Sequence, residues 1–357
     1  MRKEAFESIK KKMRELGLDS LLIVKRSNVR YITDFTGEGS YAVIGPVKST
    51  FLTTPLYEEQ ARTTVKEPFK VQAIKENIIK GFAGFDSSFW GERVGYESEA
   101  VTCSVLQKLK NALQDVEFVP TTGIIEGLRE IKDSSEINSI TRAQHITEHV
   151  FDAVLDLVRE GVRERELAYE IDYRFRKEGG ERSAFETIVA SGPNSSLPHA
   201  VPSDRKLKAG DIVLFDMGTV IDGYSSDMTR TVVLGEADTE QKKLYSLVLD
   251  AQKAAIDSIS AGTKCLETYQ AALNVFEKAG YGEKFIHSLG HGVGLEVHEN
   301  PLLSLSSKSI LKKNSVVTVE PGVYIPGWGG IRLEDMVRVT ENGCVNLTNT
   351  PKTLIEL

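Results

Sequence analysis

Two carboxylates in the second half of the chain each close a strongly apolar strand. Asp216 follows Ile212 to Phe215, and Glu320 follows Val316 to Val319. A buried carboxylate is unfavourable unless a cation or a set of hydrogen-bond donors compensates its charge. We therefore expect each of these acids either to bind a cation or to form a buried ion pair.

Two further acids can reach the same place. Asp227 follows Asp216 after the turn signal Asp222-Gly223, which would fold the strand of Asp227 back beside Asp216. Glu334 lies on another strand that returns toward the same region. For any one of these acids a structural salt bridge explains the sequence equally well, but their convergence favours a shared cation site.

The charge of such a cluster indicates which cations it would hold. Neighbouring carboxylates about 4 Å apart repel by about 4 kcal/mol at an effective dielectric constant of 20, and two divalent cations would neutralise four of them. His291 stands in a glycine-rich segment whose backbone can approach the cluster closely. One imidazole among oxygen ligands suits manganese, cobalt, iron or zinc better than calcium.

The first third of the chain alternates short apolar strands with amphipathic helices, which predicts an α/β domain. Strands are expected at residues 20–25, 41–44, 49–53, 93–96 and 116–120, and helices at 2–16, 55–66 and 98–113.

The remainder repeats one order of elements twice. Asp133 and Glu136 form a capping-box pattern that begins a long helix, and we place the domains at residues 1–125 and 126–357. Each half has two helices followed by a β region, which predicts an α+β domain of pseudo-symmetric αα-ββ halves. The expected elements are helices at 134–160 and 164–178 with strands at 211–233, then helices at 239–260 and 266–279 with strands at 315–320 and 331–339.

Six motifs occur in the order and spacing of the pita-bread metallopeptidases, and the chain resembles their Xaa-Pro aminopeptidase (aminopeptidase P) and prolidase branch. The resemblance covers nearly the whole chain, because that branch carries a smaller creatinase-type N-terminal α/β domain. The motifs are Pro198-His199, Asp216-Met-Gly218, Tyr224-x-Ser226-Asp227-x-Thr229-Arg230-Thr231, Gly290-His291-Gly292-x-Gly294-Leu295-x-x-His298-Glu299, Glu320-Pro321-Gly322-x-Tyr324 and Arg332-x-Glu334-Asp335.

The resemblance implies a site for two divalent metal ions, with manganese favoured over cobalt or zinc. Glu320 would also shuttle a proton, and Arg332 would order carboxylates and substrate. His199 and His298 would act in catalysis and bind the substrate at its peptide carbonyl, and Tyr324 would help form the proline pocket. The implied metal ligands are Asp216, Asp227, His291, Glu320 and Glu334.

The resemblance also implies peptide substrates with proline at the second position and a homodimer. Leu302-Leu303 stands where many prolidases have an arginine thought to pair with the free carboxylate of a dipeptide. We therefore expect an Xaa-Pro aminopeptidase acting on longer peptides, with a prolidase acting on Xaa-Pro dipeptides as the alternative.

Other proteins on this scaffold fit less well. Methionine aminopeptidase usually lacks the long N-terminal domain, and creatinase lacks the metal ligands. A catalytically silent peptide-binding protein would have no use for five intact ligands together with His199, His298 and Arg332.

Composition excludes several other classes. A net charge of −7 disfavours nucleic acid as a partner. No apolar run approaches the roughly 20 residues of a membrane span, and the charged N-terminus does not resemble a secretory signal. Three scattered cysteines do not form a disulfide framework, so we expect a cytoplasmic protein.

Two motif-like segments are set aside. His145-Ile-Thr-Glu148-His149 matches a zinc-protease pattern, but both histidines fall away from the apolar face of their predicted helix, which indicates a solvated pair. Gly37-Glu-Gly39 approximates a dinucleotide fingerprint, but a strand and not a helix is expected after it.

Overall fold

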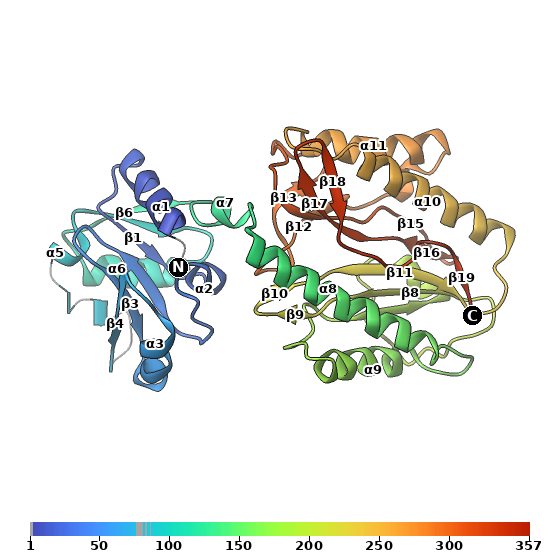
Figure 1. Cartoon of the computed structure of the whole chain (residues 1–357), viewed down its shortest axis with the longest axis horizontal. Helices are drawn as coiled ribbons and strands as arrows, with labels where there is room; N and C mark the ends of the chain where they lie inside the picture. The colour runs from blue at the N-terminus through green and yellow to red at the C-terminus, as the bar shows by residue number, and fades with distance from the viewer. Residues whose placement is uncertain (1–2, 76–80, 83, 86) are drawn as a thin grey trace. The chain divides into compact units, whose positions relative to one another are not determined.

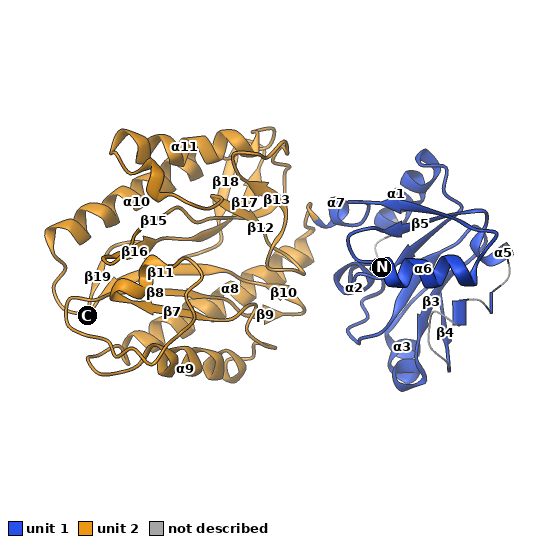
Figure 2. Cartoon of the chain, turned by 180° about the vertical axis from the view of Figure 1, so that it is seen from behind, with its two compact units in different colours: residues 1–129 blue, residues 130–357 orange. Residues whose placement is uncertain are grey.

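The computed structural model describes residues 3–75, 81–82, 84–85 and 87–357, and the chain forms two compact units, Met1–Arg129 and Glu130–Leu357 (Figure 2). Each unit is described by itself below.

The first unit is a mixed sheet of six strands with helices around it, as the alternating pattern predicts. The strand order is β4-β3-β2-β1-β5-β6. Its strands are β1 (Ser20–Ile23), β2 (Tyr41–Ile44), β3 (Ser49–Thr53), β4 (Phe69–Ala73), β5 (Arg93–Glu97) and β6 (Glu117–Thr121). Its helices are α1 (Lys3–Glu15), α2 (Arg26–Thr33), α3 (Glu58–Thr64) after a 3-10 turn at Pro55–Tyr57, α5 (Ser87–Trp90), α6 (Cys103–Ala112) and α7 (Glu126–Arg129).

The first helix shows why the pattern is informative. Phe6, Ile9 and Met13 recur at helical spacing and are buried against the sheet. The expected helix corresponds to α1, and residue 2 of that expectation lies outside the described residues.

The second unit contains two similar halves, each with a helix pair and strands. The first half has α8 (Ser134–Leu155), α9 (Glu164–Lys177), β7 (Ile188–Ser191), β8 (Ile212–Met217) and β11 (Met228–Val233). The second half has α10 (Thr239–Asp257), α11 (Cys265–Lys278), β12 (Gly290–Gly292), β13 (Glu299–Leu303), β14 (Val316–Val319), β17 (Asp335–Thr340) and β18 (Gly343–Asn346).

The strands of the two halves lie between the two helix pairs (Figure 1). One sheet has the order β19-β11-β8-β7, with β19 at Ile355–Glu356, and the other has the order β13-β12-β14-β17-β18. Two hairpins complete the unit, β9 (Val220–Ile221) with β10 (Tyr224–Ser225) and β15 (Gly322–Ile325) with β16 (Gly329–Arg332).

The long helix α8 begins where its capping pattern predicts. The Asp133 carboxylate accepts from the backbone N–H of Glu136 at 3.0 Å, and the Glu136 carboxylate accepts from the backbone N–H of Asp133 at 2.9 Å. The two bonds satisfy donors that the helix itself leaves unpaired.

Candidate metal centre

Asp216 and Asp227 are brought together by a pair of antiparallel strands. Asp216 lies in β8 opposite Thr229 of β11, and Asp227 directly precedes β11. The connection turns through Asp222 and Gly223, whose φ angles are +51° and +80°, a conformation that Gly adopts freely and Asp tolerates. The predicted turn and its consequence for the two strands are confirmed.

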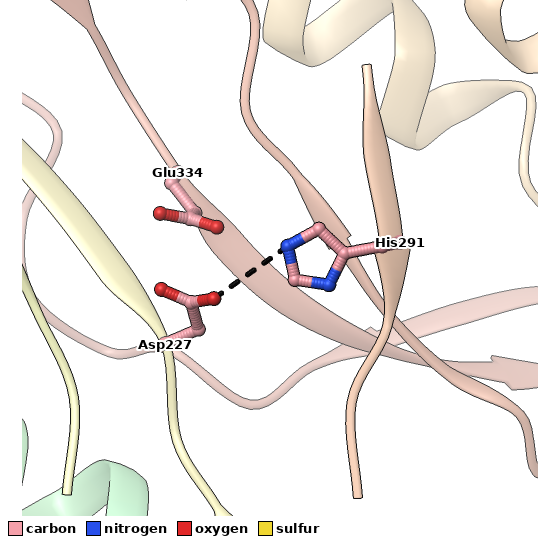
Figure 3. A group of neighbouring side chains, drawn as sticks. All are labelled: Asp227, His291 and Glu334. Atoms are coloured by element: carbon pink, nitrogen blue, oxygen red, sulfur yellow. Dashed lines mark ion pairs between the residues drawn. The ribbon is translucent and has the colours of Figure 1, made fainter. Parts of the chain in front are cut away.

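Three predicted ligands face one another across the two sheets (Figure 3). One potential ligand atom from each of Asp227, His291 and Glu334 lies within 4.8 Å of the others, and all three residues are buried. His291 Nε2 is 3.6 Å from Asp227 Oδ2. The strands β11, β12 and β17 therefore bring to one place groups that are far apart in the sequence.

Glu320 reaches the same cluster from the end of β14. Its Oε1 lies 3.3 Å from His291 Nε2 and accepts from the Thr318 hydroxyl at 3.2 Å. The same hydroxyl accepts from the backbone N–H of His291 at 3.0 Å. Thr318 thus fixes the distance between the imidazole and the carboxylate.

Asp216 is the fifth predicted ligand, and its two carboxylate oxygens differ in their hydrogen bonds. Arg332 Nη2 donates to Asp216 Oδ2 at 2.6 Å. Asp216 Oδ1 is buried and has no hydrogen-bond partner among the described residues. An unpaired buried carboxylate oxygen that shares a pocket with Asp227, Glu320 and Glu334 is suited to a cation.

The pKa values of these acids also indicate a cation site. Burial, followed by the neighbouring carboxylates, raises the pKa of Asp227 and of Glu334 well above their usual range. Burial also raises the pKa of Asp216, although the Arg332 charge opposes that change. Without a cation the cluster favours protons, and a bound divalent ion would reverse this preference. Four carboxylates with one imidazole therefore fit the expected metal ions.

Glu320 differs from the other acids. Burial raises its pKa, but the hydrogen bond and positive charge of His291 outweigh burial and lower it to about 2. Next to it, the ring of His298 lies 3.9 Å from that of His291, centroid to centroid. Burial and the charge of His291 lower the pKa of His298 to about 4, so His298 is a neutral imidazole near pH 7.

The cluster forms one wall of a cavity of about 350 Å³. His199, His298, Glu320 and Arg332 line it, as expected for residues that would contact a substrate. The apolar residues that line it, called the apolar wall below, are Phe185, Ile188, Pro198, Ala200, Val201 and Pro202.

Tyr324 is placed differently from the expectation. It is buried and does not line the cavity, and its hydroxyl accepts from Arg332 Nη1 at 2.8 Å. Burial raises its pKa to about 12. Tyr324 therefore supports Arg332 from behind, and its expected contact with proline has no counterpart in this arrangement.

His287 lines the cavity although its sequence context indicates no role. Its Nε2 pairs with the Tyr324 hydroxyl at 2.9 Å and its Nδ1 with the Ser288 carbonyl at 2.7 Å. Burial lowers its pKa. The one available signal is its position four residues before His291, on the segment that leads into β12.

The segments set aside on sequence grounds are uninvolved. His145 and His149 are exposed, while Glu148 is buried and accepts from the backbone N–H of Asn349. The strand β2 follows Gly37-Glu-Gly39, as expected.

Comparison with known proteins gives this site its context. Residues 138–341 match metallopeptidase family M24, and residues 6–131 match the creatinase/prolidase N-terminal domain. The chain belongs to metallopeptidase family M24. The expected family, the pita-bread architecture with its creatinase-type N-terminal domain and the assignment as a metallo-exopeptidase are confirmed.

Relatives of the M24 protein resemble it over almost their full length. It is 38% identical to the Xaa-Pro dipeptidase of Pyrococcus furiosus, over 99% of this chain and 100% of that one. The structure of the Xaa-Pro dipeptidase from Bacillus anthracis has a TM-score of 0.96 at 38% identity, covering 99% of each chain. The X-Pro aminopeptidase from Thermotoga maritima has a TM-score of 0.89 at 35% identity, covering 97% of this chain and 100% of that one.

Within the described residues of the M24 protein, no helix combines the length and the hydrophobicity needed to cross a lipid bilayer.

Proposed function

We propose that this M24 metallopeptidase hydrolyses the bond between an N-terminal residue and a following proline, and that Xaa-Pro dipeptides are its main substrates. One observation carries the proposal: four carboxylates and an imidazole, the residues of the expected ligand set, line one cavity together with a group of apolar side chains. The cavity can receive a proline ring beside a group of metal ligands. The names of the relatives support the dipeptidase more than the aminopeptidase that Leu302 led us to expect.

The proposed ligands are the five residues of the expected set: Asp216, Asp227, His291, Glu320 and Glu334. Two divalent ions held there would polarise the scissile carbonyl and make a water nucleophilic near neutral pH. The lowered pKa of Glu320 keeps it ionised, and as a carboxylate beside the proposed metal ions it could take up a proton from the water and pass it to the proline nitrogen.

The remaining residues orient the substrate and stabilise developing charge. His298 is neutral near pH 7, so it can donate a hydrogen bond to the peptide carbonyl without adding charge. His199, on the loop between β7 and β8, lines the same cavity and can offer the substrate a second hydrogen bond. Arg332 holds Asp216 in place and keeps its own charge, because burial is outweighed by nearby Tyr324, Asp216 and Glu320, which raise its pKa.

A second candidate is an Xaa-Pro aminopeptidase acting on longer peptides. Leu302 favours it, since a leucine cannot pair with the free carboxylate of a dipeptide. The structural similarity to the Thermotoga maritima X-Pro aminopeptidase agrees with this candidate.

Kinetics on matched substrates test the proposal. The protein is loaded with manganese, and kcat/KM is compared on an Xaa-Pro dipeptide, an Xaa-Pro-Xaa tripeptide and the same dipeptide with alanine in place of proline. The dipeptidase requires a higher value for the Xaa-Pro dipeptide than for either other substrate. A tripeptide preference favours the aminopeptidase instead, and absence of turnover with manganese, cobalt and zinc overturns the proposed peptidase and favours the silent peptide-binding alternative.

Manganese as the native ion, a homodimer and a cytoplasmic location stay predictions. Metal analysis of protein purified without chelator tests the ion. Mass measurement by light scattering tests the dimer, which would have twice the chain mass of 39.5 kDa.

A further inference from the structure

A loop between β7 and β8 carries one of the proposed catalytic histidines. His199 is exposed on this loop and lines the cavity, and its imidazole makes no hydrogen bond with any residue in the described ranges. Its position is therefore set by the backbone of residues 192–202. The same loop supplies most of the apolar wall: Pro198, Ala200, Val201 and Pro202.

One buried carboxylate binds both ends of this loop. Glu164, at the start of α9, is fully buried. Its Oε1 accepts from the backbone N–H and the hydroxyl of Ser191, each at 2.7 Å. Its Oε2 accepts from the backbone N–H of Ser203 at 3.0 Å and from the Ser203 hydroxyl at 2.6 Å. Asn194 Nδ2 donates to both oxygens at 3.1 Å.

A cation reinforces the same arrangement from outside. Arg205 donates to the Ser191 hydroxyl at 2.6 Å and forms a two-bond ion pair with Asp211 at 2.6 and 2.8 Å. Hydrogen bonds to an ionised carboxylate are roughly twice as strong as bonds between neutral groups. The carboxylate of Glu164 therefore holds the loop more firmly than an amide of the same shape would.

The loop also contacts the metal side of the cavity. Arg332 Nη1 donates to the Pro198 carbonyl at 3.3 Å, and the Gly330 backbone N–H donates to the Ser195 hydroxyl at 2.8 Å. Glu164 thus holds the two ends of the loop, and Gly330 and Arg332 of β16 hold two points within it.

We propose that Glu164 is a positioning residue for the peptidase reaction: it fixes loop 192–202 so that His199 and the apolar wall face the metal ligands. The proposal rests on the proposed function. Glu164 does not line the cavity, so it acts only through the loop that it holds.

Hydrogen exchange tests the loop directly, without reference to activity. Glu164→Gln keeps the side-chain shape and removes the charge, and Glu166→Gln makes the same change at an exposed carboxylate two residues further along α9. We expect amide exchange in residues 192–202 to accelerate by at least about tenfold in Glu164→Gln and to be unchanged in Glu166→Gln. Equal exchange in the two variants overturns the proposal.

Kinetics separate positioning from a general structural role. In the metal-loaded protein we expect Glu164→Gln to lower kcat/KM on the preferred Xaa-Pro peptide by about 10- to 100-fold, since small misplacements of catalytic groups have effects of this size. When His199 is already alanine, the same change should cause a smaller loss, because only the apolar residues of the loop remain to be misplaced. An equal loss in both backgrounds overturns the proposal.

A milder variant covers the case in which Glu164→Gln does not fold. Ser203→Ala removes one of the loop donors, and we expect a smaller loss with the same dependence on His199. If the unaltered protein hydrolyses no Xaa-Pro peptide, the proposed function fails, while the exchange measurement still decides whether Glu164 holds the loop.

Discussion

The two oxygens of Asp216 have different surroundings. Oδ2 is held by Arg332, whereas Oδ1 is buried without a partner among the described residues. The cluster as a whole thus presents more anionic oxygens than the protein itself can satisfy. This excess of acceptors is what a metal centre requires and what a structural salt bridge would avoid.

Replacing one of these acids should weaken metal binding in a protein that still folds. We expect Glu334→Gln to reduce the bound metal and to lower kcat by more than the 10- to 100-fold that is typical for residues that only support metal ligands. Metal content and turnover are measured together. Glu341→Gln, an exposed acid of the same half paired with Lys313, is the control and should behave as the unaltered protein. Full turnover of Glu334→Gln would exclude the proposed metal centre.

Metal affinity should depend on pH in a defined direction. The raised pKa values of Asp227 and Glu334 mean that the metal-free protein binds protons at these acids, which must leave when a cation enters. We therefore expect affinity to increase as pH rises above the ordinary carboxyl range, with proton release on binding. Calorimetry in buffers of different ionisation enthalpy measures the release. Affinity that is constant between pH 5 and 8 would contradict this assignment.

The ligands could be predicted from the sequence, but the rest of the cavity could not. Asp216 and Asp227 are recognisable because a turn signal separates two apolar strands and thereby fixes which residues meet. His287 carries no such signal, since its role depends on Tyr324 from a different strand pair. The position of Tyr324 could not be predicted either, because its proximity in sequence to Glu320 does not reveal that its hydroxyl accepts from Arg332.

Among the elements, β12 and β13 determine which residue lies beside His291, one of the proposed metal ligands. The two strands pair so that Leu302 is directly opposite His291, and residues in opposite positions share one face of the sheet. Leu302 is 42% exposed. Leu302 does not line the cavity itself, so a substitution here tests whether the substrate extends toward this strand.

A charge at position 302 should shift the substrate preference toward dipeptides. We expect Leu302→Arg to raise the ratio of kcat/KM for an Xaa-Pro dipeptide over an Xaa-Pro-Xaa tripeptide by about tenfold, the value of one modest charged hydrogen bond. Leu305→Arg, exposed beyond the end of β13, is the matched control. An unchanged ratio would show that the substrate carboxylate does not reach this strand.

The strand β12 also shows why some elements cannot be predicted from the sequence. It has three residues, two of them glycines, so it carries no alternating pattern. Its glycines are explained only by its neighbours: a Cβ at Gly290 would collide with the Thr318 carbonyl, and one at Gly292 with the Asn300 carbonyl. The helices α8 to α11, in contrast, are long enough for their periodicity and caps to be recognised.

At the scale of the molecule, all five proposed ligands belong to the unit of residues 130–357. A ligand stabilises the state that binds it, by about 2.7 kcal/mol at a concentration 100 times its Kd. We expect a chelator to lower the thermal stability of this unit and to leave residues 3–75 of the other unit unaffected. Hydrogen exchange of peptides from β8 and β1, with and without metal, measures both units in one experiment. A chelator effect of equal size in the two peptides would refute a metal confined to one unit.

The strand β19 has a consequence for how this protein is made. It lies beside β11, the strand that follows Asp227, and at its end the backbone N–H of Leu357 donates to the Val233 carbonyl at 2.9 Å. During translation β11 has both of its neighbours only after residue 356 has left the ribosome, more than 120 residues after β11 itself. The sheet that carries Asp216 and Asp227 therefore cannot be completed before residue 356 has been made, whereas the six strands of the first unit are complete by residue 121.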